Sequence, residues 1–307
     1  MKRRPALVLS ALVVALAGCG AGDADDDRLD VVTSFYPATF LAERIGGDLV
    51  DVTTLTSPGT EAHDLELSAK QVIALNEAAV VVHLSQFQPA VDHAVAEAER
   101  DPATTADMAA GVAPLEAVEE HEHDDHEGHG HEHAGGDPHL WLAPASMITA
   151  AETVRDALIA ADPEHAEAYE RNAAALRGDL EALDAEFRAG LARCERRDFV
   201  TSHAAFGHLA HAYDLHQIAI SGLDPHAEPS TAALARITDL VRAEGITTVF
   251  TERLASPALA ETVARETGAR TAVLDPIEGL TEETADEDYL SLMRQNLAAL
   301  QEANGCS

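Results

Sequence analysis

Histidines and carboxylates are concentrated in one internal segment of the chain. Residues 121–133 contain five carboxylates and six histidines, which are His121, His123, His126, His129, His131 and His133. No apolar side chain is present in this run to drive burial, so we expect it to stay solvated. Neutral imidazole is a ligand for zinc, copper, nickel and iron, so we expect the segment to contact metal ions. The alternatives are a solvated acidic loop or a tag, although a tag would lie at a terminus.

Four further candidate ligands lie in short loops elsewhere. They are His63 in Pro58–Ser68, His139 in Asp137–Pro144, His203 in Thr201–Gly207 and Glu278 in Leu274–Gly279. Three imidazoles and one carboxylate form a four-coordinate set that favours zinc. Their separations of 76, 64 and 75 residues match no local zinc-finger pattern. From these residues alone we infer a secreted, metal-related protein, and the arrangement of its site stays open.

Short apolar runs alternate with helix-like stretches along the chain, which is typical of parallel sheets with right-handed crossovers. Strands are predicted at Asp30–Ser34, Leu49–Leu55, Ala79–Leu84, Phe199–Ser202, His216–Ile220, Ile246–Thr251 and Arg270–Leu274. Helices are predicted up to Gly46, at Ala69–Glu77, up to Arg100, and at Ala204–Tyr213, Ser230–Ala243, Pro257–Thr267 and Glu287–Glu302. His63, His203 and Glu278 then fall at or near the carboxyl ends of strands, where open α/β sheets bind ligands.

The predicted fold is α/β, with two lobes that each contain a parallel sheet flanked by helices. The N-terminal lobe covers residues 29–161 and includes a His-rich loop at 119–136, and the C-terminal lobe covers 195–307. Residues 162–194 are expected to join them as one long helix, because Pro163 to about Arg193 consists mainly of good helix formers. Asp162 is the expected N-cap. Such a helix would span roughly 45 Å and limit hinge motion between the lobes.

The N-terminus is typical of a secretory signal peptide covering residues 1–19. Met1–Arg4 is basic and Ala6–Leu16 is apolar. The run Leu16-Ala-Gly-Cys19 resembles a bacterial lipobox, which implies cleavage before Cys19 and lipid attachment to its sulfur. The protein is then expected outside the cytoplasm, held to the cell membrane by lipid alone, with residues 20–28 as a tether. The alternative is ordinary secretion with an accidental cysteine.

Two cysteines remain if Cys19 carries lipid. An oxidising compartment favours a disulfide between Cys194 and Cys306, and the alternative is two unpaired thiols. The net charge of −34 argues against binding to nucleic acid or to anionic membrane surfaces. A hydrophobic fraction of 46% is sufficient for a sizeable core.

Several loops together resemble the metal-binding family of ABC-importer solute-binding proteins, and most closely its zinc-specific members. The matching runs are Pro58-Gly-Thr-Glu-Ala-His63-Asp, Asp137-Pro-His-Leu-Trp-Leu142, Ser202-His-Ala-Ala-Phe-Gly207, Gly222-Leu-Asp-Pro-His-Ala-Glu-Pro-Ser230, Val249-Phe-Thr-Glu252 and Leu274-Asp-Pro-Ile-Glu278. An acidic His-rich loop before the second run is characteristic of the zinc members. The resemblance covers residues 29–307. It implies two lobes, a spanning helix, Zn²⁺ bound in an interlobe cleft and an ABC permease as partner. We expect a monomer.

The resemblance also bears on the identity of the metal. Manganese-type relatives place a carboxylate at the third ligand position, where this chain has His203, and more nitrogen favours zinc. Glu278 is the expected fourth ligand, with water or Glu61 as alternatives, because some zinc members lack this carboxylate. Glu252 is expected to support a ligand rather than to bind metal itself. No ligand role is expected for His226, and His208, His211 and His216 are expected to be surface or helix residues.

Other functions are weighed against this one. A secreted zinc hydrolase would need an open coordination position and a general base, and the chain has no His-Glu-x-x-His run. A serine nucleophile is not indicated either, because no Gly-x-Ser-x-Gly run occurs. We therefore expect no enzyme activity. A zinc storage or buffering protein that uses mainly the His-rich loop, and a manganese-binding or other divalent-metal-binding importer component, remain as alternatives.

Overall fold

The computed structural model describes residues 28–115 and 136–307. The predicted signal peptide, the lipidation site Cys19, most of the predicted tether and the six histidines between residues 121 and 133 lie outside these ranges.

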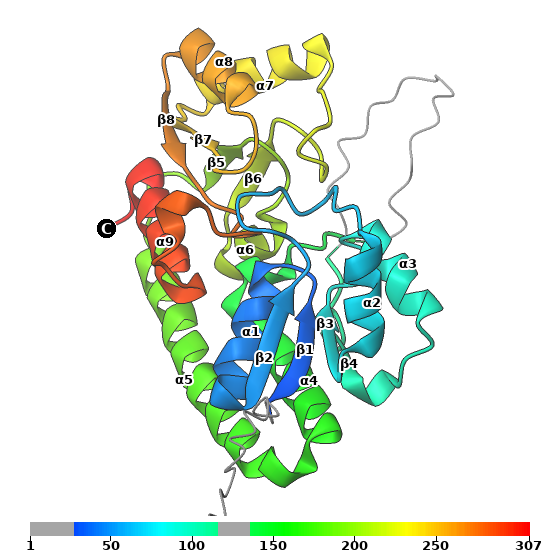
Figure 1. Ribbon diagram of the computed structural model, residues 1–307. Coiled ribbons are helices and arrows are strands. Elements are labelled where there is room, and N and C mark those ends of the chain that lie inside the picture. Colours follow the sequence, from blue (N-terminus) through cyan, green and yellow to red (C-terminus); the bar gives the residue numbers. More distant parts are fainter. Residues whose placement is uncertain (1–27, 116–135) are drawn as a thin grey trace, which may run out of the picture.

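Two four-stranded parallel sheets form the framework of the molecule, one in each lobe (Figure 1). The first sheet has the order β2-β1-β3-β4 and consists of β1 (Leu29–Thr33), β2 (Val50–Thr54), β3 (Val80–His83) and β4 (Thr105–Asp107). The second has the order β6-β5-β7-β8 and consists of β5 (Asp198–Thr201), β6 (His216–Ala219), β7 (Thr248–Thr251) and β8 (Arg270–Val273). The two halves of the chain therefore repeat one topology, as the alternating pattern predicted.

The strand β3 shows why the apolar runs were informative. All four of its residues are buried, as expected for a strand covered on both faces. The edge strand β4 was not predicted, because it is only three residues long and only Ala106 within it is buried. So short a strand has no periodicity that a sequence pattern can reveal.

Nine helices lie among the described residues. They are α1 (Tyr36–Gly46), α2 (Ala69–Glu77), α3 (Pro89–Glu97), α4 (Pro144–Ala161), α5 (Ala166–Gly190), α6 (Gly207–Tyr213), α7 (Thr231–Ala243), α8 (Ala258–Thr267) and α9 (Tyr289–Asn304). The predicted start of α2 is confirmed, since Ser68 forms a capping box with Gln71. Within this part of the chain, no helix is both long and apolar enough to cross a membrane.

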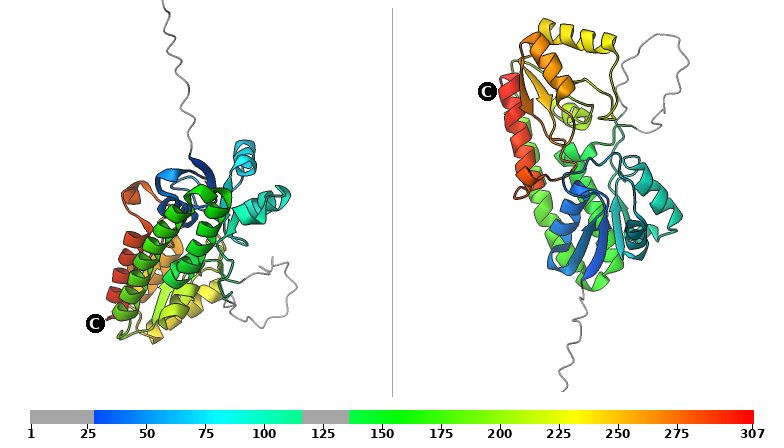
Figure 2. Two further views of the ribbon diagram at one scale, coloured as in Figure 1. Left: turned by 90° about the horizontal axis from the view of Figure 1, so that it is seen from below. Right: turned by 45° about the horizontal axis from the view of Figure 1, so that its top comes forward.

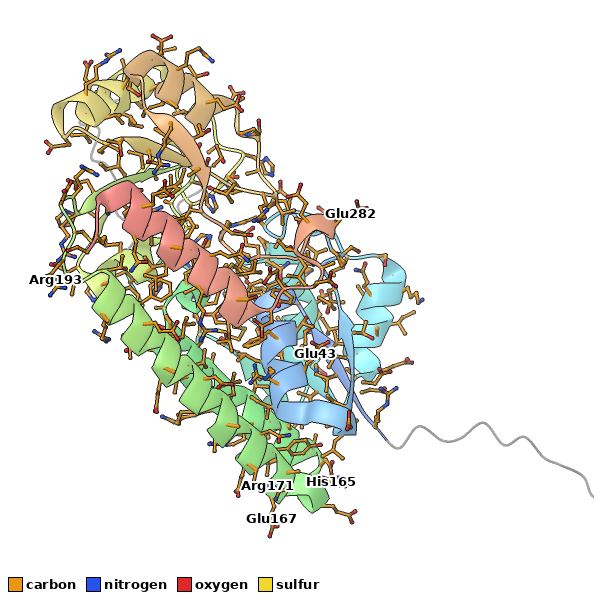
Figure 3. The ribbon with its side chains drawn as sticks, turned by 90° about the vertical axis from the view of Figure 1, so that its left-hand side faces the viewer. Glu43, His165, Glu167, Arg171, Arg193 and Glu282 are labelled. Atoms are coloured by element: carbon orange, nitrogen blue, oxygen red, sulfur yellow. A yellow bond between two sulfur atoms is a disulfide. The ribbon has the colours of Figure 1, made fainter. Side chains whose placement is uncertain are left out.

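The long helix α5 begins and ends differently from the prediction. A 3₁₀ turn at Pro163–His165 comes first, and the side chain of Asp162 accepts a hydrogen bond from the Tyr169 hydroxyl at 2.8 Å instead of capping backbone amides. The helix ends at Gly190, and the next carbonyl, that of Leu191, accepts a hydrogen bond from Arg197 at 2.9 Å. Figure 3 shows His165, Glu167 and Arg171 at one end of α5 and Arg193 beyond the other.

The helix α4 was not predicted, and it packs beside α5 along much of its length (Figure 2). It has 18 residues, and its N-cap position is Ala143, which has no side chain able to accept a hydrogen bond. Both helices turn an apolar stripe inward. Leu176, Leu180 and Leu183 of α5 are fully buried, as are Met147 and Val154 of α4.

Three hydrophobic clusters hold these elements together. The largest contains residues of both sheets, such as Val82 and Phe250, together with the inner faces of α4, α5 and α9. Each lobe has a smaller cluster of its own, around Leu75 in the first and around Val249 in the second. The Sγ atoms of Cys194 and Cys306 are bonded to each other, which attaches the end of α9 to the segment after α5. The two lobes therefore share one continuous core.

Candidate metal centre

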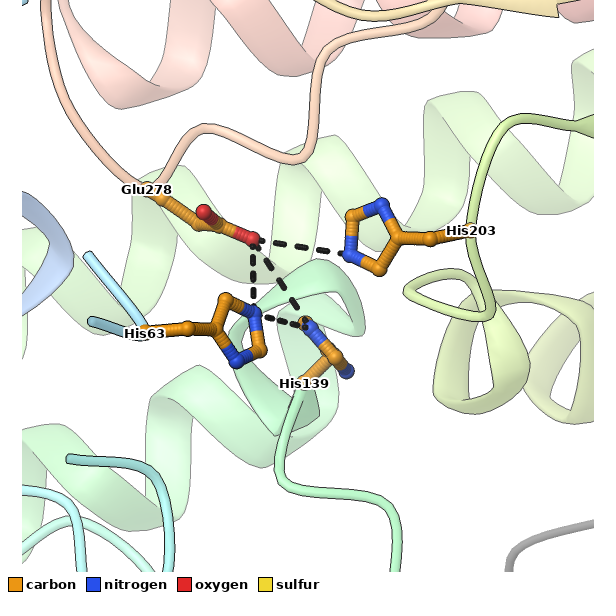
Figure 4. A group of neighbouring side chains, drawn as sticks. All are labelled: His63, His139, His203 and Glu278. Atoms are coloured by element: carbon orange, nitrogen blue, oxygen red, sulfur yellow. Dashed lines mark hydrogen bonds and ion pairs between the residues drawn. The ribbon is translucent and has the colours of Figure 1, made fainter. Parts of the chain in front are cut away.

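The four candidate ligands come from four loops and meet between the two sheets (Figure 4). His63 follows β2 and Glu278 follows β8, while His203 follows β5 directly. His139 precedes a buried 3₁₀ turn at Leu140–Leu142 that leads into α4. The N-terminal lobe thus supplies two of the side chains and the C-terminal lobe supplies the other two.

The donor atoms of these residues are separated by distances that suit one small cation. Oε1 of Glu278 lies 3.3 Å from Nε2 of His63, 3.7 Å from Nε2 of His203 and 3.8 Å from Nε2 of His139. The Nε2 atoms of His63 and His139 are 3.3 Å apart. Zinc–ligand bonds of about 2.0–2.1 Å in a tetrahedron give ligand–ligand separations of roughly 3.3–3.4 Å. Two of the four measured distances match this value and the other two exceed it by about 0.4 Å, so all four atoms lie close enough together to share one ion.

Burial makes this arrangement costly without a cation. The side chains of His139, His203 and Glu278 are 0%, 1% and 3% exposed, and that of His63 is 14% exposed. Within residues 28–115 and 136–307, neither Nε2 of His203 nor Oε1 of Glu278 has a hydrogen-bond partner. An unpaired buried polar group costs about 1–3 kcal/mol. A metal ion bound by both atoms would remove that cost.

Asp137 orients His139. Its Oδ1 atom lies 2.8 Å from Nδ1 of His139 and accepts a hydrogen bond from the His139 backbone amide at 2.9 Å. This pairing turns Nε2 toward the other three ligands, as second partners do in metal sites. Burial lowers the pKa of His139 well below its usual value, and the neighbouring histidines lower it further. Burial also raises the pKa of Asp137 to about 6, despite its hydrogen bonds.

Glu252 orients His203 in the same way as Asp137 orients His139. Its Oε2 atom lies 2.7 Å from Nδ1 of His203, and its Oε1 atom accepts a hydrogen bond from the His203 backbone amide at 3.1 Å. Burial by itself would lower the pKa of His203, but the hydrogen bond and charge of Glu252, with the charges of Glu278 and Glu61, raise it. The position of Glu252 matches the expectation that it supports a ligand.

A strained turn aims Glu278. Ile277 has a φ of 57°, which is rare for a β-branched residue, and it is fully buried. The Oδ1 atom of Asp275 accepts a hydrogen bond from the Ile277 amide at 2.8 Å, and Arg253 Nε lies 3.0 Å from Asp275 Oδ2. Backbone strain of this kind persists where surrounding contacts impose it. Burial raises the pKa of Glu278, an effect that His63 and His203 partly offset.

The remaining candidates lie outside this four-residue set. Glu61 accepts hydrogen bonds from the backbone amides of His63 and Asp64, at 2.8 Å and 3.3 Å. His208 is a buried residue of α6, and its Nε2 lies 2.9 Å from the carbonyl oxygen of Asp137. His211 and His216 are exposed, as is His226, which lies beside Glu61 and Asp64.

Aromatic residues that were not predicted from the sequence surround the centre. The Phe87 ring meets the His63 ring edge-on, with centroids 4.7 Å apart, and Trp141 packs against both Phe87 and His139. Phe87 follows β3 in a stretch without a motif. Trp141 lies within a recognised run, but nothing in that run indicates a packing role.

Two parallel α/β lobes, with three imidazole nitrogens and one carboxylate oxygen buried between them, define a two-lobed metal-binding protein. Comparison with known protein families identifies which metal-binding family the chain belongs to. The family described as the periplasmic component A of the zinc-uptake complex matches residues 31–303, and the chain belongs to this family.

Individual relatives agree with this membership. The chain is 39% identical over 306 residues to the zinc-binding lipoprotein AdcA of Streptococcus pneumoniae serotype 4, a match that covers 98% of this chain and 61% of that protein. It is 34% identical to the high-affinity zinc uptake system protein ZnuA of Bacillus subtilis, with 96% of each chain covered. The solved structure of the Zn(II)-bound ZnuA-like domain of S. pneumoniae AdcA is 37% identical in sequence, with a TM-score of 0.75. The match covers 90% of this chain and 99% of that domain.

Proposed function

We propose that this protein is the extracytoplasmic zinc-binding component of an ABC importer. It binds Zn²⁺ through His63, His139, His203 and Glu278 and passes the ion to a membrane permease. The observation that carries this proposal is the convergence of four donor atoms from both lobes within 4.8 Å of one another. Two of these atoms are buried without a hydrogen-bond partner among the described residues. The zinc named in the descriptions of its relatives supports the same choice of metal.

The donor set favours zinc over manganese. Manganese and magnesium prefer oxygen ligands, whereas imidazole suits zinc. A buried tetrahedron with three nitrogens and one oxygen leaves no room for the six oxygens that manganese takes. The importer role for another divalent metal is therefore the weaker alternative.

A binding role also fits the site better than catalysis. Hydrolytic zinc sites keep one coordination position for water, and here a fourth protein donor, Glu278, faces the three histidines. A zinc storage protein that used only the His-rich loop would not need the four buried donors, so the four-residue set argues against this alternative. We retain the loop histidines as additional, weaker zinc ligands beside the centre, and lipid at Cys19 as the anchor; both rest on the sequence.

Competition between metals tests the proposal. Protein purified without chelators would be titrated calorimetrically with zinc and with manganese, in the parent and in His203→Ala. We expect a tight zinc site in the parent that manganese does not displace, and its loss in His203→Ala. His216→Ala is the matched control, because His216 is exposed in the same lobe. Tight zinc binding that survives His203→Ala would refute the ligand assignment.

A further inference from the structure

A second group of side chains that could bind a metal ion lies next to the buried centre, because Glu61 contacts the backbone of His63. Glu61 and Asp64 belong to the loop between β2 and α2, and His226 belongs to the loop between β6 and α7. One donor atom from each residue lies within 4.8 Å of the other two. The group therefore brings together a loop from each lobe.

The distances within this group resemble those of the buried centre. Nε2 of His226 lies 3.6 Å from Oε2 of Glu61 and 3.5 Å from Oδ2 of Asp64. These values are close to the roughly 3.3 Å separation expected of ligands that share one zinc ion. One imidazole and two carboxylates also form the kind of donor set that zinc sites use, with water completing the coordination.

The loop geometry holds two of the three side chains in place. Oε1 of Glu61 accepts a hydrogen bond from the His63 amide, and its Oε2 accepts one from the Asp64 amide. In the other lobe, the His226 amide donates to Oδ1 of Asp224 at 2.7 Å. Glu61 thus contacts the backbone of a ligand of the buried centre while its other oxygen faces His226.

Two of the three side chains are far more exposed than any side chain of the buried centre. The side chains of Asp64 and His226 are 77% and 53% exposed, whereas that of Glu61 is 12% exposed. His63, the neighbour of this group in the chain, is the most exposed of the four buried ligands at 14%. An ion held by the outer group would therefore lie close to His63 and in contact with solvent.

We propose that Glu61, Asp64 and His226 form a second, exposed zinc site that connects the two lobes beside the buried centre. Because Asp64 and His226 are solvated and the site has fewer protein donors, it binds zinc more weakly and exchanges it faster than the buried centre does. Its position makes it a first stop for an ion on the way inward. The inference goes beyond the importer function, since that function rests on the four buried donors alone.

Anomalous scattering locates the ions directly. Crystals of the full chain loaded with zinc would be measured on both sides of the zinc absorption edge. We expect one anomalous peak among the four buried donors and another among Glu61, Asp64 and His226. A peak at the buried centre with none at the outer group overturns this inference and leaves the importer proposal intact. A peak at the outer group alone would contradict the importer proposal instead.

Equilibrium dialysis of the full chain at saturating zinc tests the outer site in solution. His226→Ala should lose about one bound zinc ion relative to the parent, and His216→Ala, which also removes an exposed histidine of the C-terminal lobe, should lose none. Asp64→Asn is a second test, paired with Glu66→Gln as an exposed acid two residues away. Equal zinc content in each test variant and its control overturns the proposal.

Discussion

The indole Nε1 of Trp141 donates a hydrogen bond of 2.7 Å to the carbonyl oxygen of Pro276. These two residues are 135 positions apart in the chain, and each lies two residues from a proposed ligand, His139 in one lobe and Glu278 in the other. The Trp141 carbonyl in turn accepts a hydrogen bond from the Tyr289 hydroxyl at 2.5 Å. One buried tryptophan therefore fixes two ligand loops relative to each other.

Replacing Trp141 by Phe should weaken zinc binding without removing a ligand. The change leaves the Pro276 carbonyl without its donor, at a cost of about 1–3 kcal/mol in the free energy of unfolding. We expect the zinc dissociation constant to rise roughly tenfold, equivalent to about 1.4 kcal/mol. Tyr169→Phe is the control, because it also removes a hydrogen-bond donor from a buried aromatic side chain. This donor bonds to Asp162, which is not part of the centre. Similar zinc affinities in the two variants would show that the Trp141–Pro276 bond does not position the ligands.

Gly207→Ala should reduce zinc affinity through Asp137. A Cβ atom at Gly207 would lie 2.3 Å from Oδ2 of Asp137, so the carboxylate that orients His139 must move. Loss of such a partner typically costs 10–100-fold in metal affinity, roughly the change expected here. Gly178→Ala in α5 is the matched control, because its new Cβ meets nothing within 4 Å. That control should raise the free energy of unfolding by about 0.5–1 kcal/mol and leave zinc binding unchanged; calorimetry and urea titration measure the two quantities.

Glu278→Gln tests the fourth ligand. The amide keeps the size and hydrogen-bonding shape of the carboxylate but removes its charge, so we expect a preserved fold and a zinc affinity lower by on the order of 10-fold or more. Circular dichroism monitors the fold and calorimetry the affinity. Glu66→Gln, at an exposed position, should behave like the parent. Parental affinity in Glu278→Gln would assign the fourth position to water or to Glu61.

The pH dependence of zinc binding should follow His203. Its pKa lies above the ordinary 6.5, whereas burial keeps His139 neutral at that pH. Zinc requires the neutral imidazole, so protons compete as the pH falls through the raised pKa, and the affinity should then drop by about tenfold per pH unit. Glu252→Gln removes the main contribution that opposes burial, so it should move this inflection to lower pH. It should also weaken zinc binding at pH 8, because His203 loses the carboxylate that orients it. An unchanged inflection in calorimetric titrations across pH would contradict this account.

The disulfide should stabilise the fold. Cys194 and Cys306 are 112 residues apart, and closing so long a loop contributes up to roughly 4–5 kcal/mol in the chain-entropy model. The double variant Cys194→Ser/Cys306→Ser should therefore unfold at lower urea concentration. Mass spectrometry of unreduced peptides should detect the linked pair in secreted protein. Two free thiols there, or a double variant of parental stability, would count against this contribution.

The sequence predicted best those features that depend on local patterns. Buried strands such as β3 appear as continuous apolar runs, and Ser68 with Gln71 marks the start of α2. Three of the four candidate ligands lie in the loops that follow parallel strands, as predicted, because such strands present their carboxyl ends at one edge of a sheet. The helix α4 was missed because Ala143 has no side chain that can cap it, and Pro144 at the first helical position is a weaker start signal by itself.

Other features depend on contacts between distant segments and leave no local pattern. The positive φ of Ile277 occurs at a residue type that normally avoids it. The approach of Asp137 to Gly207 joins segments 70 residues apart in the sequence. Asp137 belongs to a run that was recognised in the sequence. Whether its carboxylate binds a metal ion or the Nδ1 atom of His139 depends on how the imidazole ring of His139 is oriented. Only the assembled structure shows these relationships.

Equal contribution of donors by the two lobes has a thermodynamic consequence. The affinity for the ion depends on the relative position of the lobes, because donors from both lobes bind it. A change in one therefore changes the other. A macromolecule that binds better to the separated lobes must lower the affinity for zinc. By reciprocity, zinc lowers the affinity for that macromolecule by the same factor. Such a macromolecule would therefore favour release of the ion through its own binding energy, without a change in pH.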